Sequence, residues 1–170
     1  MQESAKRTIL VVDDEQFVRS ALLQLLQADG YQVLEASDGD EALEILQRTP
    51  VQLLISDQNM PGMSGIDLLK LVGVRHPRVL RIMLTADKDP EIVVRSINEG
   101  EVYRFIRKPW NNHELRTIIH YAFRIVRLED EKRKLIALVR EQQKAHREGK
   151  DPVGLESELL LLAEDEAKEG

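Results

Sequence analysis

The chain has 170 residues with no cysteine, 32% of them charged, and a formal net charge of −6 at pH 7. This composition suits one domain of ordinary size with an appendage, and it excludes a disulfide framework and a thiolate metal site. Because residues 1–8 lack the apolar stretch of a signal peptide and no apolar run approaches the roughly 20 residues that span a bilayer, we expect a cytoplasmic protein with no membrane segment.

Apolar runs rich in Val, Ile and Leu alternate along the chain with segments of helical period. This alternation is typical of a doubly wound α/β fold, in which a parallel sheet is covered by helices on both faces. Five strands are predicted, each followed by a helix. They are Thr8–Val12, Tyr31–Ala36, Val51–Ser56, Val79–Thr85 and Tyr103–Arg107.

Residues that cap free backbone groups mark the helix boundaries. The first helix is expected to end at Gly30, and its apolar stripe consists of Phe17, Ala21, Leu22, Leu25 and Leu26. Three later helices begin at an acceptor that is followed three residues on by a reciprocating acid, namely Asp38 with Glu41, Ser64 with Asp67 and Asn111 with Glu114. Asp89 before Pro90 predicts the start of the fourth helix.

Polar residues follow the predicted strands at the carboxyl edge of the sheet, where ligands bind in open α/β folds. They are Asp13, Asp14 and Glu15 after the first strand, Asp57 after the third, Thr85 and Ala86 after the fourth, and Lys108 before Pro109 after the fifth. Three aspartates gathered on one rim repel one another unless a cation neutralises them. Carboxylates, a backbone carbonyl and waters are the ligands that Mg²⁺ prefers, so we expect Mg²⁺, or Mn²⁺ in its place, among these acids.

With such an ion in place, one carboxylate can act as a nucleophile toward phosphorus and form an aspartyl phosphate. Phosphoryl transfer then needs mainly alignment and charge stabilisation, which the ion and the Lys108 ammonium can supply. Taken singly, an Asp-Asp pair is usually a helix cap, and an aspartate before a turn is usually turn chemistry. The functional interpretation depends on all of these residues lying at one end of one sheet.

Four motifs resemble those of a known family, and they are ILVVDDE, SD followed by NMPGMSG, IMLTA and FIRKPW. In this order and spacing they resemble the receiver domain of bacterial two-component response regulators, over about residues 8–126. The resemblance implies a CheY-like, flavodoxin-like sheet of order 2-1-3-4-5. It also implies a signalling switch rather than an enzyme, with a sensor histidine kinase or phosphotransfer protein as the phosphoryl donor.

The resemblance further implies a role for each acidic-site residue. Asp57 is the expected phosphoacceptor. Asp14 and Asp57 are expected to bind the metal directly, together with the backbone carbonyl of Asn59, while Asp13 acts through water. Asn59 and Asp87 occupy positions that tune the lifetime of the phosphate in the family.

On the basic side of the site, the resemblance implies that Lys108 pairs with the phosphoryl group and that the backbone of Ala86 contributes to binding it. Thr85 and Phe105 match the pair that turns inward together when the family's switch operates. The surface formed by the fourth helix, the fifth strand and the fifth helix is therefore expected to change on phosphorylation.

The last predicted helix continues beyond the receiver, since no Pro or Gly interrupts the chain between residues 110 and 148. Its apolar residues recur three or four apart, the spacing of a coiled-coil seam, with Lys132 as a polar intrusion. The seam residues are Ile118, Tyr121, Ile125, Leu128, Leu135 and Val139. We expect residues 127–148 to form a coiled coil in a parallel homodimer, and a helix that packs on a downstream domain is the open alternative.

The ends of the chain add little to the predicted function. Residues 1–7 are a flank, and residues 149–170 are a linker and an acidic tail. Residues 151–170 contain seven acids and one base, so the preceding residues are neutral with 23 of each, and no nucleic-acid-binding surface is expected. No effector signature follows residue 150, so a downstream partner cannot be named from the sequence.

Three other classes of protein share part of this residue pattern. A phosphatase of the haloacid dehalogenase type would place a second acid two residues after the nucleophile, where this chain has Asn59. A flavodoxin-like cofactor protein would hold phosphate in a loop rich in hydroxyls and glycine, where Asp13 and Asp14 repel it. A degenerate receiver that acts as a phosphorylation-independent interaction scaffold stays the closest alternative.

Overall fold

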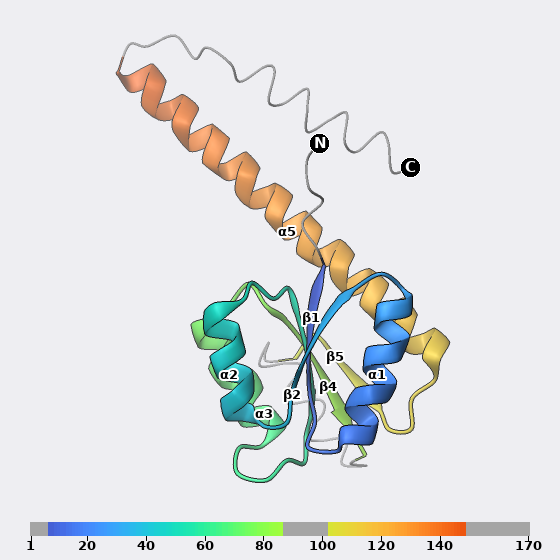
Figure 1. Ribbon diagram of the computed structural model, residues 1–170. Coiled ribbons are helices and arrows are strands. Elements are labelled where there is room, and N and C mark those ends of the chain that lie inside the picture. The colour runs from blue at the N-terminus through green and yellow to red at the C-terminus, as the bar shows by residue number, and fades with distance from the viewer. Residues whose placement is uncertain (1–6, 87–101, 149–170) are drawn as a thin grey trace. The chain divides into compact units, whose positions relative to one another are not determined.

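The computed structural model describes residues 7–86 and 102–148, and it confirms the doubly wound sheet (Figure 1). Within these residues, five parallel strands lie in the order β2-β1-β3-β4-β5. The strands are β1 (Thr8–Val12), β2 (Gln32–Ala36), β3 (Leu53–Asp57), β4 (Leu80–Thr85) and β5 (Arg104–Arg107). The helices are α1 (Gln16–Ala28), α2 (Gly39–Arg48), α3 (Gly65–Arg75) and α5 (Asn112–Arg147).

The order of the strands places β1 and β3 at the point where the chain changes direction across the sheet. From β1 the chain goes outward to β2, and it then returns past β1 to β3. Val12 is paired with Ser56 in this register, so the residues that follow them, Asp13 and Asp57, lie next to each other at the carboxyl edge. Crevices at such a reversal are where ligands bind in open parallel sheets.

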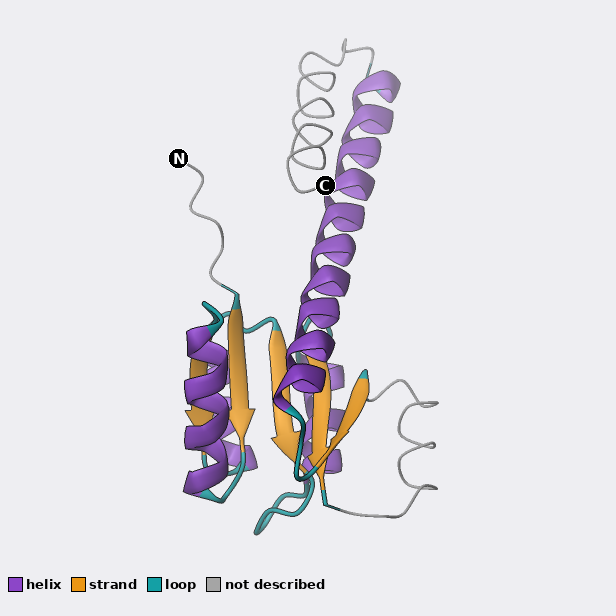
Figure 2. Ribbon diagram, turned by 90° about the vertical axis from the view of Figure 1, so that its right-hand side faces the viewer, coloured by secondary structure: helices purple, strands orange, loops and turns teal. Residues whose placement is uncertain are grey.

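Alternate residues of each strand enter two separate core clusters, one on each face of the sheet. Ile9 and Val11 of β1 pack with α1 and α5, whereas Leu10 and Val12 pack with α2 and α3. Figures 1 and 2 show these helices as two layers with the sheet between them. Each fully buried aliphatic side chain contributes about 1.5–3 kcal/mol through the hydrophobic effect, so the two clusters hold the carboxyl edge in a rigid frame.

The predicted helix caps are confirmed where the structure describes them. The backbone N–H groups of Glu41, Asp67 and Glu114 donate to the side chains of Asp38 (2.9 Å), Ser64 (3.3 Å) and Asn111 (3.1 Å) respectively. The reciprocal bonds differ from the prediction: at α2 the Glu41 carboxylate accepts from the backbone N–H of Ser37, and at α3 the Asp67 carboxylate accepts from the Ser64 hydroxyl. Gly30 has a φ of 87° and follows α1, as expected of a helix terminator. The start predicted at Asp89 and Pro90 lies outside the described residues.

Two local predictions are wrong. Phe17 is 85% exposed and does not belong to the buried stripe of α1; Val18 packs against the core with Leu22 and Leu26 instead. Residues 18, 22 and 26 are four apart and share one face, whereas residue 17 lies five positions before Leu22 and faces away. The third strand begins and ends later than predicted, and Asp57 is its last residue because it still pairs with Leu84 of β4.

The chain divides into two compact units, Met1–Val126 and Arg127–Gly170. In the first unit, the beginning of α5 packs against the sheet through Leu115, Ile119, Ala122 and Phe123. In the second unit, the described residues 127–148 continue the helix to Arg147. Among the helices that the structure describes, none combines the length and the apolar character needed to cross a membrane.

Candidate functional site

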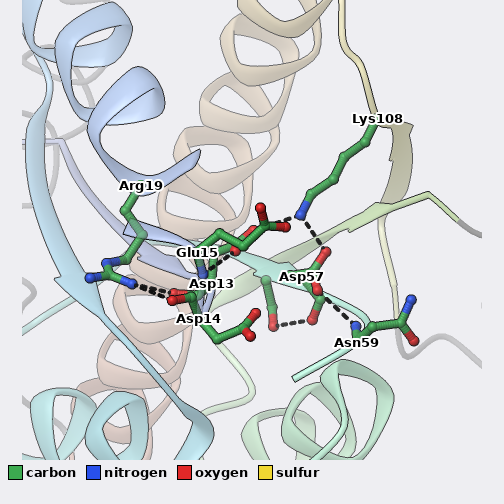
Figure 3. Close-up of polar contacts among 8 residues, drawn as sticks. Asp13, Asp14, Glu15, Arg19, Asp57, Asn59 and Lys108 are labelled. Atoms are coloured by element: carbon green, nitrogen blue, oxygen red, sulfur yellow. Dashed lines mark hydrogen bonds and ion pairs between the residues drawn. The ribbon is translucent and has the colours of Figure 1, made fainter. Parts of the chain in front are cut away.

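Asp57 occupies the centre of the acidic site at the end of β3 (Figure 3). Asp57 is only 5% exposed, and each of its carboxylate oxygens has a hydrogen-bonding or ionic partner. Oδ1 lies 2.7 Å from Nζ of Lys108, and Oδ2 accepts the backbone N–H of Asn59 at 2.8 Å. Since each carboxylate oxygen has a second lone pair, Asp57 can still bind a metal ion or attack an electrophile.

Lys108 bridges two of the predicted acids. Its Nζ lies 2.8 Å from Oδ2 of Asp13 as well as 2.7 Å from Oδ1 of Asp57. Burial acts to lower the pKa of Lys108, but hydrogen bonds to Asp13 and Asp57 and the negative charges of both acids outweigh it, so its pKa is raised above the usual value. Lys108 is therefore an ammonium cation at neutral pH.

Asp13 and Asp14 occupy the loop between β1 and α1 and differ in their surroundings. Asp13 is fully buried, and its Oδ1 accepts the backbone N–H of Glu15 at 2.9 Å. Asp14 is exposed at the carboxyl edge of the sheet, and its carboxylate points toward Asp57 (Figure 3). The structure thus brings all three predicted aspartates and the predicted lysine to one edge of the sheet.

Lys108 supplies part of the positive charge that the sequence analysis assigns to a metal ion. The sequence predicts that a metal ion allows the acids to coexist, but the Lys108 ammonium already lies between Asp13 and Asp57. Three carboxylates and one ammonium still leave two negative charges uncompensated, and the donors are hard oxygens, which fits a divalent ion such as Mg²⁺. Within residues 7–86 and 102–148, no three acidic or histidine side chains converge to hold a metal by themselves. An ion here would be bound by few protein groups and by water, as is typical of Mg²⁺.

The predicted switch residues lie on the neighbouring strands. Thr85 ends β4 and is 5% exposed, and its carbonyl accepts the backbone N–H of Lys108 at 2.9 Å. Ala86 follows it and is exposed. Phe105 of β5 pairs with Met83 and is half-buried against the core cluster on the α2 and α3 side of the sheet. Asp87 lies outside the described residues.

Two residues near the acids were not identified from the sequence. Oε1 of Gln58 accepts the backbone N–H of Ile66 at 3.0 Å, and this bond closes the loop between β3 and α3. The guanidinium of Arg19 donates to the backbone carbonyls of Asp13 and Asp14. No spacing rule predicts the Gln58 contact, which spans eight residues. The Arg19 contact had one usable signal, since helical side chains lean toward the N-terminal end of their helix.

The predicted seam of α5 is exposed along most of its length. Tyr121, Leu128, Leu135 and Val139 are between 44% and 54% exposed. Ile118 is half-buried and packs against the core cluster that α1 and α5 share, and Ile125 is also half-buried. The outer part of the seam therefore presents large apolar side chains to solvent.

Comparisons with known proteins agree with this arrangement. A sequence model of the response regulator receiver domain matches residues 9–120. The hydrogenase transcriptional regulatory protein HoxA of Cupriavidus necator is 41% identical over 103 residues, 61% of this chain and 21% of that protein. Sporulation initiation phosphotransferase F of Bacillus subtilis is 32% identical over 111 residues, 65% of this chain and 89% of that protein.

Solved structures share the fold as well. The crystal structure of the signal receiver domain of an HD domain-containing protein from Pseudomonas fluorescens Pf-5 matches with a TM-score of 0.69 and 35% identity, covering 72% of this chain and 98% of that one. Several of the curated relatives are much longer than the region they share with this chain, which spans 21% to 37% of their lengths.

Proposed function

The chain belongs to the response regulator receiver family, and from this premise we propose that it is a cytoplasmic signalling switch that accepts a phosphoryl group on Asp57. The donor is a phosphohistidine of a sensor kinase or phosphotransfer protein. One observation carries the proposal: a buried carboxylate ends a central strand, at the reversal of strand order, with a lysine ammonium 2.7 Å away. The only chemistry proposed for the chain is the gain and loss of its own phosphoryl group.

In the proposed step, a carboxylate oxygen of Asp57 attacks phosphorus and the phosphorus–nitrogen bond of the phosphohistidine breaks. The electron pair leaves with the imidazole nitrogen, which takes up a proton from solvent. Lys108 already contacts Asp57 and is placed to pair with the phosphoryl oxygens by charge-assisted hydrogen bonds. Mg²⁺, held by Asp14, Asp57 and the Asn59 carbonyl and through water by Asp13, would offset the negative charge that the incoming anion meets.

The switch proposed here responds to the charge that phosphorylation adds, about −1.5 to −2. Thr85 lies at the end of the adjacent strand, and its carbonyl is already joined to the backbone of Lys108. A conformation that brings the Thr85 hydroxyl toward the phosphate, with Phe105 turning inward, gains population when that charge appears. Conversion from mostly inactive to mostly active requires about 5 kcal/mol of differential stabilisation, which several charge-assisted hydrogen bonds can supply.

We expect the wild-type protein to gain the mass of one phosphoryl group when it is incubated with Mg²⁺ and acetyl phosphate, and Asp57→Asn to gain none. The amide is not a nucleophile toward phosphorus, so the substitution removes the acceptor and preserves its shape. Intact-mass spectrometry measures the outcome. Asp40→Asn, on the exposed first turn of α2, is the matched control and should gain mass like the wild type.

A mass gain that survives in Asp57→Asn would place the acceptor elsewhere. No gain in any variant, and none from a phosphorylated histidine kinase domain, would favour the phosphorylation-independent scaffold.

We propose in addition that the α5 seam pairs with the same seam of a second copy in a parallel coiled coil. Its exposed positions are too apolar to remain in water without cost, since burying each leucine contributes about 1.5–3 kcal/mol. Charge favours a second copy in parallel orientation. Arg124 precedes the seam residue Ile125, and Glu129 follows the seam residue Leu128. These are the flanking positions that face each other across a parallel pair, with opposite charges.

The dimer proposal predicts that Leu135→Lys raises the dimer dissociation constant at least about 100-fold, because two seam leucines are lost per dimer. Sedimentation or light scattering over a concentration series measures this, with and without acetyl phosphate. Ala137→Lys introduces the same charge on an exposed position away from the seam and should leave the dimer intact. A wild-type protein that stays monomeric would instead favour packing of the helix on a different domain.

A further inference from the structure

Arg19 holds the loop that carries two of the acids, although it touches neither carboxylate. It lies in the first turn of α1, and its side chain reaches back past the start of the helix (Figure 3). Its Nη1 donates to the backbone carbonyl of Asp13 at 2.7 Å and to that of Asp14 at 3.2 Å. One guanidinium nitrogen thus binds two successive carbonyl groups.

This contact fixes the backbone of Asp14 from both sides. The peptide plane before Asp14 contains the Asp13 carbonyl, and the plane after it contains the carbonyl of Asp14 itself. Since a residue has only two soft backbone torsions, holding both planes holds φ and ψ of Asp14 and with them the direction of its Cα–Cβ bond. Within the described residues, no hydrogen bond orients the exposed Asp14 carboxylate directly, so the backbone is what directs it.

Arg19 is itself held in place. Its side chain is only 16% exposed, and its Nε lies 3.7 Å from Oε1 of Glu35 on β2. The beginning of the loop is hydrogen-bonded to the same strand, because the Asp13 N–H donates to the carbonyl of Ala36, the last residue of β2, at 3.2 Å. Strand β2 therefore fixes the position of Arg19 with respect to the loop. A lysine at this position could not make the same contacts, because its ammonium lacks the planar set of N–H donors of a guanidinium.

We propose that Arg19 is a positioning residue that fixes the backbone of Asp14 and thereby directs its carboxylate toward a divalent cation. The inference rests on the proposed function, for which Asp14 is a metal ligand. Ligands that are already oriented need no ordering when the ion arrives, and removal of such supporting contacts typically costs about 10- to 100-fold in metal affinity.

The direction of the effect separates positioning from a simple charge effect. Arg19 is a cation near the acids, so electrostatics alone predicts that Arg19→Gln binds Mg²⁺ more tightly, because a like charge is removed. Positioning predicts weaker binding, with the dissociation constant raised about 10- to 100-fold. Arg19→Lys keeps the charge but loses the fork, so it too should bind Mg²⁺ more weakly than the wild type.

The experiment titrates Mg²⁺ into the 170-residue wild type, Arg19→Gln and Arg19→Lys by calorimetry, and measures the rate of mass gain from acetyl phosphate against Mg²⁺ concentration. We expect the half-saturating Mg²⁺ concentration to rise with the dissociation constant, while the rate at saturation stays within about three-fold, because only binding is impaired. Arg48→Gln is the matched control, since Arg48 is 78% exposed at the end of α2 and should change neither quantity.

A third readout does not depend on the metal. Amide hydrogen exchange in metal-free protein should become faster in Arg19→Gln at Asp13 and Glu15, whose N–H groups donate to the Ala36 carbonyl and the Asp13 carboxylate, while the core strands remain protected. A wild type that binds no Mg²⁺ would overturn the proposed function, and the exchange measurement would then decide the role of Arg19 separately. Unchanged exchange in the loop, or a folded Arg19→Gln that binds Mg²⁺ as tightly as the wild type or more tightly, would overturn the positioning role.

Discussion

Lys108→Ala is expected to slow phosphorylation by about 10²- to 10³-fold, the usual cost of removing a group that stabilises the transition-state charge. It should also lower the free energy of unfolding by about 3–5 kcal/mol in metal-free buffer, because it removes the cation between two buried carboxylates. The side chains of Asp13 and Asp57 are 0% and 7% exposed, so solvent screens their mutual repulsion only weakly once the ammonium is removed. Urea unfolding and the rate of mass gain from acetyl phosphate measure the two effects.

The two effects should respond differently to Mg²⁺. Without the ammonium the acids attract a divalent cation more strongly, so Lys108→Ala should bind Mg²⁺ more tightly than the wild type, and its loss of stability should shrink as Mg²⁺ is added. The rate should stay low, since the lysine contact to the phosphoryl group is missing. Lys134→Ala, exposed on α5, is the control for removal of a lysine. A Lys108→Ala protein that keeps the wild-type rate would remove Lys108 from the proposed chemistry.

Gly65→Ala is expected to destabilise the protein by more than about 3 kcal/mol, as overpacking against immobile atoms does. A Cβ added at Gly65 would lie 2.8 Å from Cα of Gln58 and 2.9 Å from the carbonyl carbon of Asp57, and closer still to the Asp57 carbonyl oxygen. All of these atoms belong to the backbone and have no flexible end that could move aside. Whatever protein folds should also accept phosphate slowly, because the strain displaces Asp57.

A matched substitution in the same helix should have the opposite sign. At Gly73 an added Cβ would lie 3.4 Å from Cζ of Arg81, which is the far end of a flexible side chain. Gly73→Ala should therefore stabilise the protein by roughly 0.5–1 kcal/mol, the usual difference between the two residues inside a helix. Thermal unfolding of the two variants checks both predictions. Equal effects at the two positions would contradict the steric argument.

Much of the fold could be predicted because its signals are local. The capping pairs that begin at Asp38 and Ser64 join residues three apart, and Gly30 ends α1 by its own backbone conformation. The continuous apolar runs of the central strands reflect burial on both faces of the sheet. The prediction that Phe17 belongs to the buried stripe of α1 failed. Phe17 is apolar, but it lies off the helix face that Leu22 and Leu26 define, and it is exposed.

The membership of the acidic site was also predictable, but its internal contacts were not. Asp13 and Lys108 each follow a strand and Asp57 ends one, and parallel strands end at the same edge, so their proximity follows from topology. The ion pairs within the site could not be predicted, because they join residues that are far apart in the chain. Lys108 and Asp13, for example, are 95 positions apart. The same holds for Arg19 and Glu35, whose contact depends on how α1 lies against β2.

The sequence by itself determined the order of elements, the helix caps and the set of residues at the carboxyl edge, because each of these follows from periodicity or from contacts within a few positions. Only the tertiary structure decided that the Lys108 ammonium lies between Asp13 and Asp57 and that Arg19 binds the backbone carbonyls of Asp13 and Asp14. The physical reason is the sequence separation of the contacts. Patterns within a few residues specify where helices and strands begin and end, whereas the distances between charged groups depend on how the whole sheet and its helices pack.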